Sequence, residues 1–177
     1  MKITLVCRGQ TEDDYLKKNI GQKNVLMNDT GRRQCQRLKL QIQQQNFNCC
    51  YTSPQVRCVE TSMILIGDRV EMIPDKRLIN RYMGDLEGQN KDDYNAYKFW
   101  DYDLNKNDYG VEPLQDVFSR CVDFIDYLKE KYTDGSIMLV VDEEIYRALR
   151  YLLVKKRLHG NLWNGIIYNC QIETFDL

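Results

Sequence analysis

Short apolar runs along this chain predict buried β-strands. Runs of four or five residues with few polar side chains are typical of strands that are covered on both faces. Such runs lie at 3–6, 49–52, 70–73 and 137–141. Gly9 follows the first run closely and allows the backbone to turn sharply, so we expect functional side chains where this strand ends.

Stretches with helical spacing alternate with these runs. Asn28 can cap a helix that reaches about residue 46, and Ser53 with Pro54 can begin another as its cap and first helical residue. The clearest helix follows residue 110, and a further one is predicted from 143 to about 156. The apolar positions of these helices include Cys35, Leu38, Leu40 and Ile42 in the first and Leu114, Val117, Phe118, Cys121, Ile125, Leu128 and Tyr132 in the clearest.

Length and charge narrow the class of protein. A chain of 177 residues with 43% apolar content can bury about 70% of its unfolded surface in one core, so we expect a single domain over 1–177. A net charge of −1 without long single-sign runs argues against nucleic acid and anionic membranes as partners. No apolar segment approaches the roughly 18 residues that span a bilayer. Because Met1 and Lys2 lead directly into the first strand, no signal or transit peptide is expected, and a cytoplasmic location follows.

The cysteines predict neither a metal site nor a disulfide framework. There are seven, an odd number, without a Cys-x-x-Cys pair, and His159 is the single histidine. Free cysteine packs as a small apolar residue, so we expect buried, reduced thiols. Cys49 and Cys50 are neighbours in a predicted strand and should therefore point to opposite faces of the sheet.

Seven segments, in the same order, resemble the motifs of one family, the histidine phosphatase superfamily or phosphoglycerate mutase-like proteins of branch 1. They lie at 5–11, 28–34, 52–62, 78–88, 110–120, 140–149 and 169–175. The resemblance implies an α/β fold, a three-layer α/β/α sandwich with a mostly parallel sheet, a closing strand at 169–175 and a pocket at the strand ends. It also implies a variable helical insertion, or lid, at about 90–110 over that pocket.

The resemblance places five residues at the family's central positions, and one of them is retained. Arg57 matches a phosphate-binding arginine, which suits the first turn of a helix where free N–H groups also face an anion. The other positions carry Cys7 for arginine, Arg8 for the nucleophilic histidine, Asn80 for the general acid and Asp142 for the second histidine. An amide cannot serve as a general acid near neutral pH. His159 falls outside every catalytic motif.

Other residues offer little replacement chemistry. A cysteine phosphatase needs five residues between its cysteine and arginine, whereas six separate Cys50 from Arg57. Cys7 lies beside Arg8, which favours a thiolate, but no acid or base accompanies it. Arg8 and Asp142 carry opposite charges at positions that face each other in the family, so we predict a salt bridge between them, with Arg57 as a further partner.

Two further features bear on what this pocket could bind. Glu143 and Glu144 follow Asp142 at the start of a predicted helix, where they suit the helix dipole and would repel phosphate. The segment at 90–109 mixes aromatic with acidic residues, which argues against nucleic acid. It is expected either to pack its rings inward as a lid or to form a contact surface for other proteins.

The substitutions lead to a prediction that the chain is not an enzyme but a pseudophosphatase that serves as a structural or scaffolding subunit of a larger protein assembly, without cofactor or metal. Its partners would be other proteins, and self-association stays open. One alternative is a non-catalytic module that binds a phosphorylated ligand or another anion through Arg8 and Arg57. Another is a phosphatase or mutase with rearranged chemistry.

Overall fold

The computed structural model describes residues 1–154 and 156–177. It contains one five-stranded sheet with the strand order β3-β2-β4-β1-β5. The strands are β1 (Lys2–Cys7), β2 (Cys49–Thr52), β3 (Met72–Pro74), β4 (Ser136–Val141) and β5 (Ile172–Asp176). The helices are α1 (Glu12–Tyr15), α2 (Asp29–Ile42), α3 (Val56–Ile66), α4 (Leu114–Lys131) and α5 (Glu143–Leu153). β1, β2, β3 and β4 run parallel to one another. The edge strand β5 pairs with β1 in the antiparallel sense.

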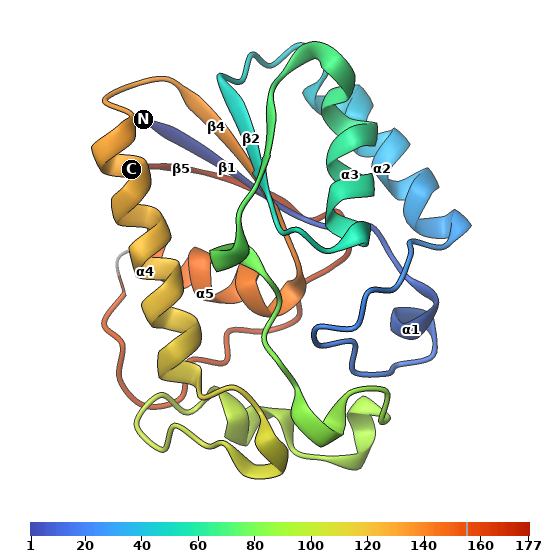
Figure 1. The fold of residues 1–177 in the computed structure, drawn as a ribbon, viewed down its shortest axis with the longest axis vertical. Coiled ribbons are helices and arrows are strands. Elements are labelled where there is room, and N and C mark those ends of the chain that lie inside the picture. Colours follow the sequence, from blue (N-terminus) through green and yellow to red (C-terminus); the bar gives the residue numbers. More distant parts are fainter. Residues whose placement is uncertain (155) are drawn as a thin grey trace.

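Helices cover both faces of the sheet, which confirms the predicted three layers. Figure 1 shows α2 and α3 together on one side of the strands and α4 and α5 on the other. Cys49 belongs to the core under α4 and α5, whereas Cys50 belongs to the core under α2 and α3, as the alternation along a strand requires. All seven cysteines are free, six of them are buried, and Cys170 is half-buried.

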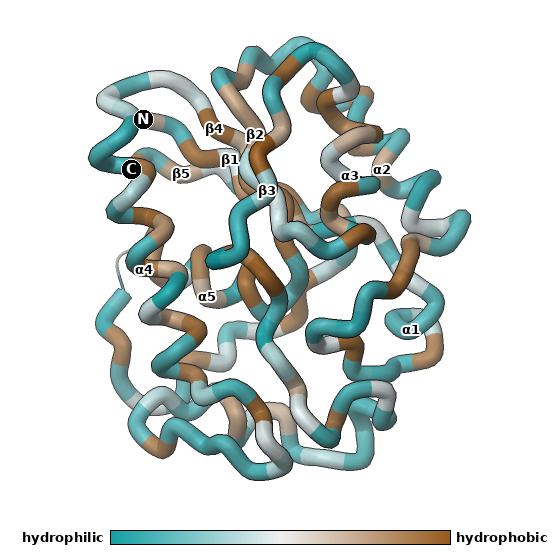
Figure 2. The backbone as a smooth tube through the Cα atoms, in the orientation of Figure 1, coloured by the Kyte–Doolittle hydropathy of each residue, from teal (hydrophilic) through white to brown (hydrophobic). Residues whose placement is uncertain are grey.

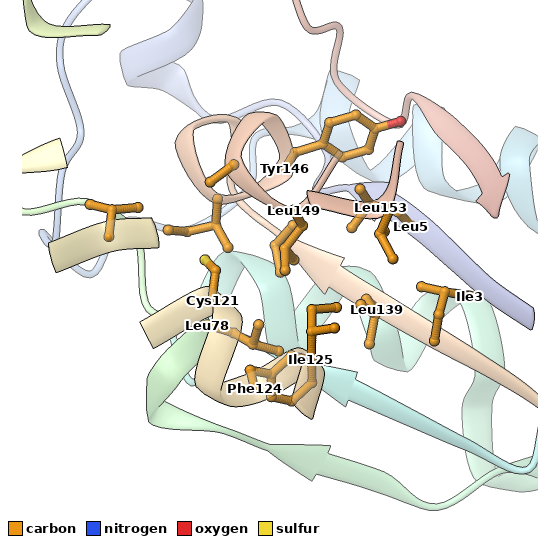
Figure 3. Packing of buried hydrophobic residues seen from close by; sticks show 14 of the residues in the cluster. Ile3, Leu5, Leu78, Cys121, Phe124, Ile125, Leu139, Tyr146, Leu149 and Leu153 are labelled. Carbon is orange, nitrogen blue, oxygen red and sulfur yellow. The ribbon is translucent and has the colours of Figure 1, made fainter. Parts of the chain in front are cut away.

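Apolar side chains of the sheet form the two cores. The tube in Figure 2 is brown along much of the central strands and largely teal in the loops. On one face, Ile3 and Leu5 of β1 and Leu139 of β4 pack with side chains of α4 and α5, as Figure 3 shows. All three are fully buried, so this part of the sheet is held by the apolar contact that the uninterrupted runs predicted.

Several predicted boundaries differ from the structure for local reasons. α3 begins at Val56 with Gln55 at its cap, rather than at Ser53 and Pro54, because the Ser53 N–H still donates to the Val140 carbonyl and prolongs the sheet contact. α2 ends at Ile42, and β5 begins at Ile172, after a turn that holds residues 169–171. β3 lies at 72–74 instead of 70–73, and α5 ends at Leu153. Leu40, assigned to the apolar side of α2, is 67% exposed.

The segment at 90–110 consists of short 3₁₀ turns at Lys91–Asp93, Ala96–Trp100 and Asp108–Gly110 rather than a longer helix. Phe99 and Trp100 are buried, in agreement with rings that pack inward. Tyr97 and Tyr109 are more than half exposed, so not every ring packs inward, and a contact surface for other proteins stays a prediction. No helix among residues 1–154 and 156–177 is both long and apolar enough to cross a membrane.

Gly31 explains one motif position by close packing. A Cβ at this residue would lie 2.2 Å from the Gln10 carbonyl oxygen and 2.6 Å from the Gln10 nitrogen, both backbone atoms. We therefore expect Gly31→Ala to lower the free energy of unfolding by about 1–3 kcal/mol, although alanine favours a helix over glycine by about 1 kcal/mol. Urea unfolding measures the change. Thr30→Ala, an exposed substitution in the same turn, is the control, and a Gly31→Ala protein as stable as this control would refute the steric account.

Candidate functional site

The parallel register of the sheet brings three charged residues together at the carboxyl ends of the strands. Cys7 of β1 is opposite Val141 of β4, so the next residues, Arg8 and Asp142, leave the sheet side by side. The Arg8 N–H donates to the Val141 carbonyl at 2.9 Å. Arg57 lies in the first turn of α3, which follows the neighbouring strand β2. This edge is where open α/β sheets place their ligand sites.

Asp142 binds both arginines. Its Oδ1 accepts from the Arg8 Nε at 2.8 Å and from the Arg57 Nε at 2.7 Å. Its Oδ2 accepts from the Cys58 thiol at 3.3 Å. The Asp142 and Arg57 side chains are fully buried, and that of Arg8 is 3% exposed. The predicted pair of Arg8 with Asp142, extended by Arg57, is therefore present in the folded chain.

Further donors of the two guanidinium groups also bind within the chain. Arg8 donates to the Gly9 carbonyl and through both terminal nitrogens to the Asp14 carboxylate. Arg57 donates to the carbonyls of Lys23 at 2.6 Å and Gly21 at 2.9 Å. A phosphate group that replaced these partners would have to break an ion pair and several backbone contacts first.

Asp14 is a site residue that the sequence interpretation missed. It lies in the short helix α1, where its carboxylate accepts the Thr11 N–H at 2.8 Å and the Thr11 side chain accepts the Asp14 N–H at 3.2 Å. This is a capping box, and a Thr followed three residues later by Asp is its sequence signature. That signal was available at 11–14, but only the fold shows that the carboxylate also reaches Arg8.

The charges of the network set the pKa values of its members. Burial opposes the ionised form of Asp142, but Arg57 and Arg8 outweigh it and hold the pKa of this carboxyl below its ordinary value of 3.8. Burial likewise opposes ionisation of Asp14, and Arg8 holds the pKa of that carboxyl below 3.8. Burial also opposes the charge on Arg8, yet Asp142 and Asp14 raise its pKa well above the ordinary value.

These shifts predict acid sensitivity. The unfolded chain protonates its aspartates near pH 3.8, whereas folded Asp142 keeps its charge to lower pH, so its contribution to stability is complete above pH 3.8 and is lost as the pH falls below that value. We expect the urea midpoint of the wild type to fall more steeply below pH 3.8 than that of Asp142→Asn, which lacks this carboxyl. Parallel curves for the two proteins would show that Asp142 does not contribute.

A small cavity adjoins Arg8. Its volume of about 30 Å³ holds roughly one water molecule and is too small for a phosphate group. Asn80, which the sequence interpretation placed at the acid position, donates through Nδ2 to the Gly21 carbonyl, and its Oδ1 has no hydrogen-bond partner among the described residues. The Nδ2 of Asn19, a residue that the motifs did not indicate, also lacks such a partner. The cavity is lined by Arg8, Asn19, Ile20, Gly21, Asn80, Met83, Lys91, Glu143 and Glu144.

A larger cleft of about 510 Å³ shares part of this lining. Its walls carry four carboxylates and two lysines, so carboxylates outnumber lysines in the lining. Glu143 and Glu144 lie in the first turn of α5 as predicted, and Glu143 pairs with Lys91 at 3.3 Å. Burial raises the pKa of Glu144. The cleft is lined by Cys7, Asp14, Lys17, Asn19, Lys91, Asp92, Tyr94, Ala96, Glu143, Glu144, Trp163, Ile166, Ile167 and Asn169.

Two residues that were considered for other chemistry lie in unsuitable surroundings. Burial raises the pKa of the Cys7 thiol far above its ordinary value, so this thiol stays protonated near neutral pH. His159 is 75% exposed, and its Nδ1 lies 2.8 Å from the Asp103 carboxylate, outside the site. Within residues 1–154 and 156–177, no group of three or more His, Cys, Asp or Glu side chains could hold a metal ion.

Comparison with known proteins gives both relatives and similar folds. Phosphoglycerate mutase-like protein 4 of Arabidopsis thaliana is 28% identical, over 84% of this chain and 69% of that protein. The structure of Bacillus stearothermophilus YhfR has a TM-score of 0.87, with 19% identity over 99% of this chain and 91% of that one. A mycobacterial glucosyl-3-phosphoglycerate phosphatase complexed with VO3 has a TM-score of 0.86, with 20% identity over 98% of this chain and 90% of that one.

These relatives correct one expectation from the sequence. The chain was predicted not to be an enzyme, because histidines and an acid are replaced at family positions. The comparison contradicts that prediction, since the similar proteins are a phosphatase with vanadate and a mutase-like protein by name. The sequence model of one family matches residues 3–177. The chain therefore belongs to the histidine phosphatase superfamily, branch 1.

Proposed function

We propose that this protein is a structural or scaffolding subunit of a larger protein assembly and that the cleft at its strand ends binds a basic side chain of a protein partner. The observation that carries the proposal is the internal pairing of Arg8 and Arg57 with Asp142. The cations at the family's phosphate position are thereby neutralised within the chain, and the cleft beside them presents an excess of carboxylates. The proposal includes a single domain over 1–177 and a cytoplasmic location.

The rim of the cleft supports a protein partner rather than a small anion. Ile166 lines the cleft and is 70% exposed, and Tyr168, two residues further along, is 68% exposed. Tyr15 and Leu16 lie between the lining residues Asp14 and Lys17 and are also exposed. Exposed aromatic and aliphatic side chains around an acidic floor suit a lysine or arginine that is flanked by apolar residues.

Native purification of the full chain with quantitative mass spectrometry tests this proposal. We expect a stoichiometric set of partners with the wild type and loss of that set with the rim double variant Ile166→Ala/Tyr168→Ala. Leu40→Ala is the matched control, because Leu40 is similarly exposed, at 67%, but lies on α2. Equal recovery of partners with the rim variant and the wild type would contradict the proposed surface.

An activity assay separates this role from rearranged phosphatase chemistry. The same preparations are given a phosphomonoester, and release of inorganic phosphate is followed against Arg57→Ala. Turnover that disappears with Arg57→Ala would favour the phosphatase alternative, because it would assign the retained arginine to a phosphorylated substrate. Under the proposed function, the Ile166→Ala/Tyr168→Ala variant loses its partners whether or not the wild type releases phosphate.

The alternative that Arg8 and Arg57 bind phosphate can be tested separately, and under the proposed function the wild type should not bind it. Both side chains are engaged by Asp142, so we expect inorganic phosphate to leave the melting temperature of the wild type unchanged. Asp142→Ala removes the competing carboxylate together with its volume, and phosphate at about ten times its Kd would then stabilise this variant by about 1.4 kcal/mol. Differential scanning fluorimetry measures both proteins. A phosphate-dependent rise in the wild type would show that the anion site is open.

A further inference from the structure

Two thiols outside the strand-end site lie within contact distance. The sulfur atoms of Cys35 and Cys170 are 3.6 Å apart, although the residues are 135 positions apart in the chain. Cys35 is on the buried side of α2 and is 0% exposed. Cys170 is half-buried, in the turn that precedes β5, so it is the more accessible member of the pair.

The surroundings of Cys170 hold this arrangement in place. Its backbone adopts a left-handed conformation with φ of +57°, and its N–H donates to the carbonyls of Cys7 and Arg8 at 3.0 and 3.2 Å. The turn is thereby fixed to the end of β1. The Cys7 side chain belongs to the core on the opposite face of the sheet, so it does not compete for Cys170.

The surroundings of Cys35 are equally defined. Besides the Cys170 sulfur, its own sulfur contacts the Met27 sulfur at 3.7 Å and the Thr61 hydroxyl at 3.8 Å. The hydrogen bond from Cys170 lowers the pKa of the Cys35 thiol, which favours the nucleophilic thiolate. The thiol that lies beside this nucleophile is that of Cys170, the more accessible member of the pair.

We infer that Cys35 and Cys170 form a reversible disulfide when the protein meets a low-molecular-weight disulfide such as oxidised glutathione. This inference does not rest on the proposed partner-binding function. The bond joins α2 to the start of the edge strand β5, two elements that are distant in the sequence. The sulfur atoms must approach from 3.6 Å to the bonding distance of about 2.05 Å.

The reaction is two successive thiol–disulfide exchanges. Its contact with Cys35 and burial raise the pKa of the Cys170 thiol, so this thiol loses its proton only as its sulfur attacks one sulfur of oxidised glutathione. A mixed disulfide forms and one glutathione thiolate leaves. The Cys35 thiolate then attacks the Cys170 sulfur, and the second glutathione leaves as a thiolate. Both glutathione thiolates take up the two protons that the cysteines lose. The cysteine pair is oxidised by two electrons, and oxidised glutathione is reduced to two thiols.

The test equilibrates the full chain with defined mixtures of reduced and oxidised glutathione, alkylates the remaining thiols in denaturant and maps the peptides by mass spectrometry. We expect two fewer alkylated cysteines at the oxidising end and a cross-linked pair of peptides that contain Cys35 and Cys170. Reduction should restore all seven thiols. Cys170→Ala should keep its remaining thiols free, whereas the control Cys121→Ala, in the core under α4, should still form the bond.

A melting curve gives a second measurement. The oxidised wild type should melt at a higher temperature than the reduced form, because the bond closes a long loop, and Cys170→Ala should show no such difference. Three results would overturn the inference. They are complete alkylation after oxidation, a glutathione adduct on Cys170 that persists, and a disulfide that joins another pair of cysteines. Cys35→Ala should also abolish the bond, but Cys35 is buried and this variant could fail to fold. Cys170 is half-buried in a turn, so Cys170→Ala then provides the test.

Discussion

Asp142→Ala is expected to lower the free energy of unfolding by about 3–5 kcal/mol. The substitution removes the carboxylate that binds Arg8 and Arg57. Arg8 keeps the Asp14 carboxylate, but the buried Arg57 guanidinium is left without a carboxylate partner. Cys58 also loses its acceptor. Most of the loss comes from the uncompensated buried charge of Arg57, because removing one partner of a buried pair costs more than the pair itself contributes. Urea unfolding at pH 7 of the wild type and the variant measures the difference.

A double-mutant cycle distinguishes ionic coupling from a loss of packing. Arg8→Ala/Asp142→Ala should recover part of the stability that Asp142→Ala loses, since removing Arg8 also removes its repulsion of the unpaired Arg57. Lys17→Ala provides the control. Lys17 pairs with Asp92 at 3.4 Å, and both side chains are about 70% exposed, so its loss should cost at most about 1 kcal/mol. If the effects of Arg8→Ala and Asp142→Ala were additive, the proposed coupling would be absent.

The central ion pair could be predicted from the sequence because it depends on few steps. Arg8 and Asp142 each follow a buried apolar run, and the motifs placed the two runs in one parallel sheet. The residues that follow neighbouring parallel strands lie next to each other at the same edge. The register pairs Cys7 with Val141 and thereby places the two charged residues side by side, which is the physical basis of the contact that the family positions predicted.

Asp14 and Asn19 could not be assigned in the same way. Both belong to the segment between β1 and α2, whose path is set by contacts with other loops. The Asn19 N–H donates to the Gln89 carbonyl, and its side chain accepts from the Tyr94 hydroxyl at 2.7 Å. These partners are about 70 residues away in the chain, and apolar periodicity carries no signal for them.

The prediction about enzymatic activity rested on too few positions of the site. The prediction that the chain is not an enzyme considered five positions, of which Arg57 was retained. The cleft, however, is lined by residues of α1, of the segment at 90–110, of α5 and of the loop before β5. Most of these lie outside the five positions, so the chemistry of the cleft depends on side chains that the motifs do not describe.

Trp100→Ala is expected to lower the free energy of unfolding by about 3–5 kcal/mol. Trp100 comes from the segment at 90–110, yet it is 1% exposed and packs in the core against Phe118 and Trp163, each with a ring separation of 6.5 Å. The buried Arg147 guanidinium lies 5.1 Å from its ring centre and 4.1 Å from that of Trp163. Alanine would create a large cavity and remove a favourable cation–π contact from this buried cation.

The same measurement with two further variants decides whether this segment belongs to the core. Trp100→Phe should recover part of the loss, because it restores an aromatic face for Arg147, although with a smaller volume. Tyr97→Ala, three residues away with a side chain that is 55% exposed, should change stability by less than about 0.5 kcal/mol. A loss of under about 1 kcal/mol for Trp100→Ala would mean that the segment at 90–110 lies over the sheet domain without stabilising it, contrary to the buried contacts of Trp100.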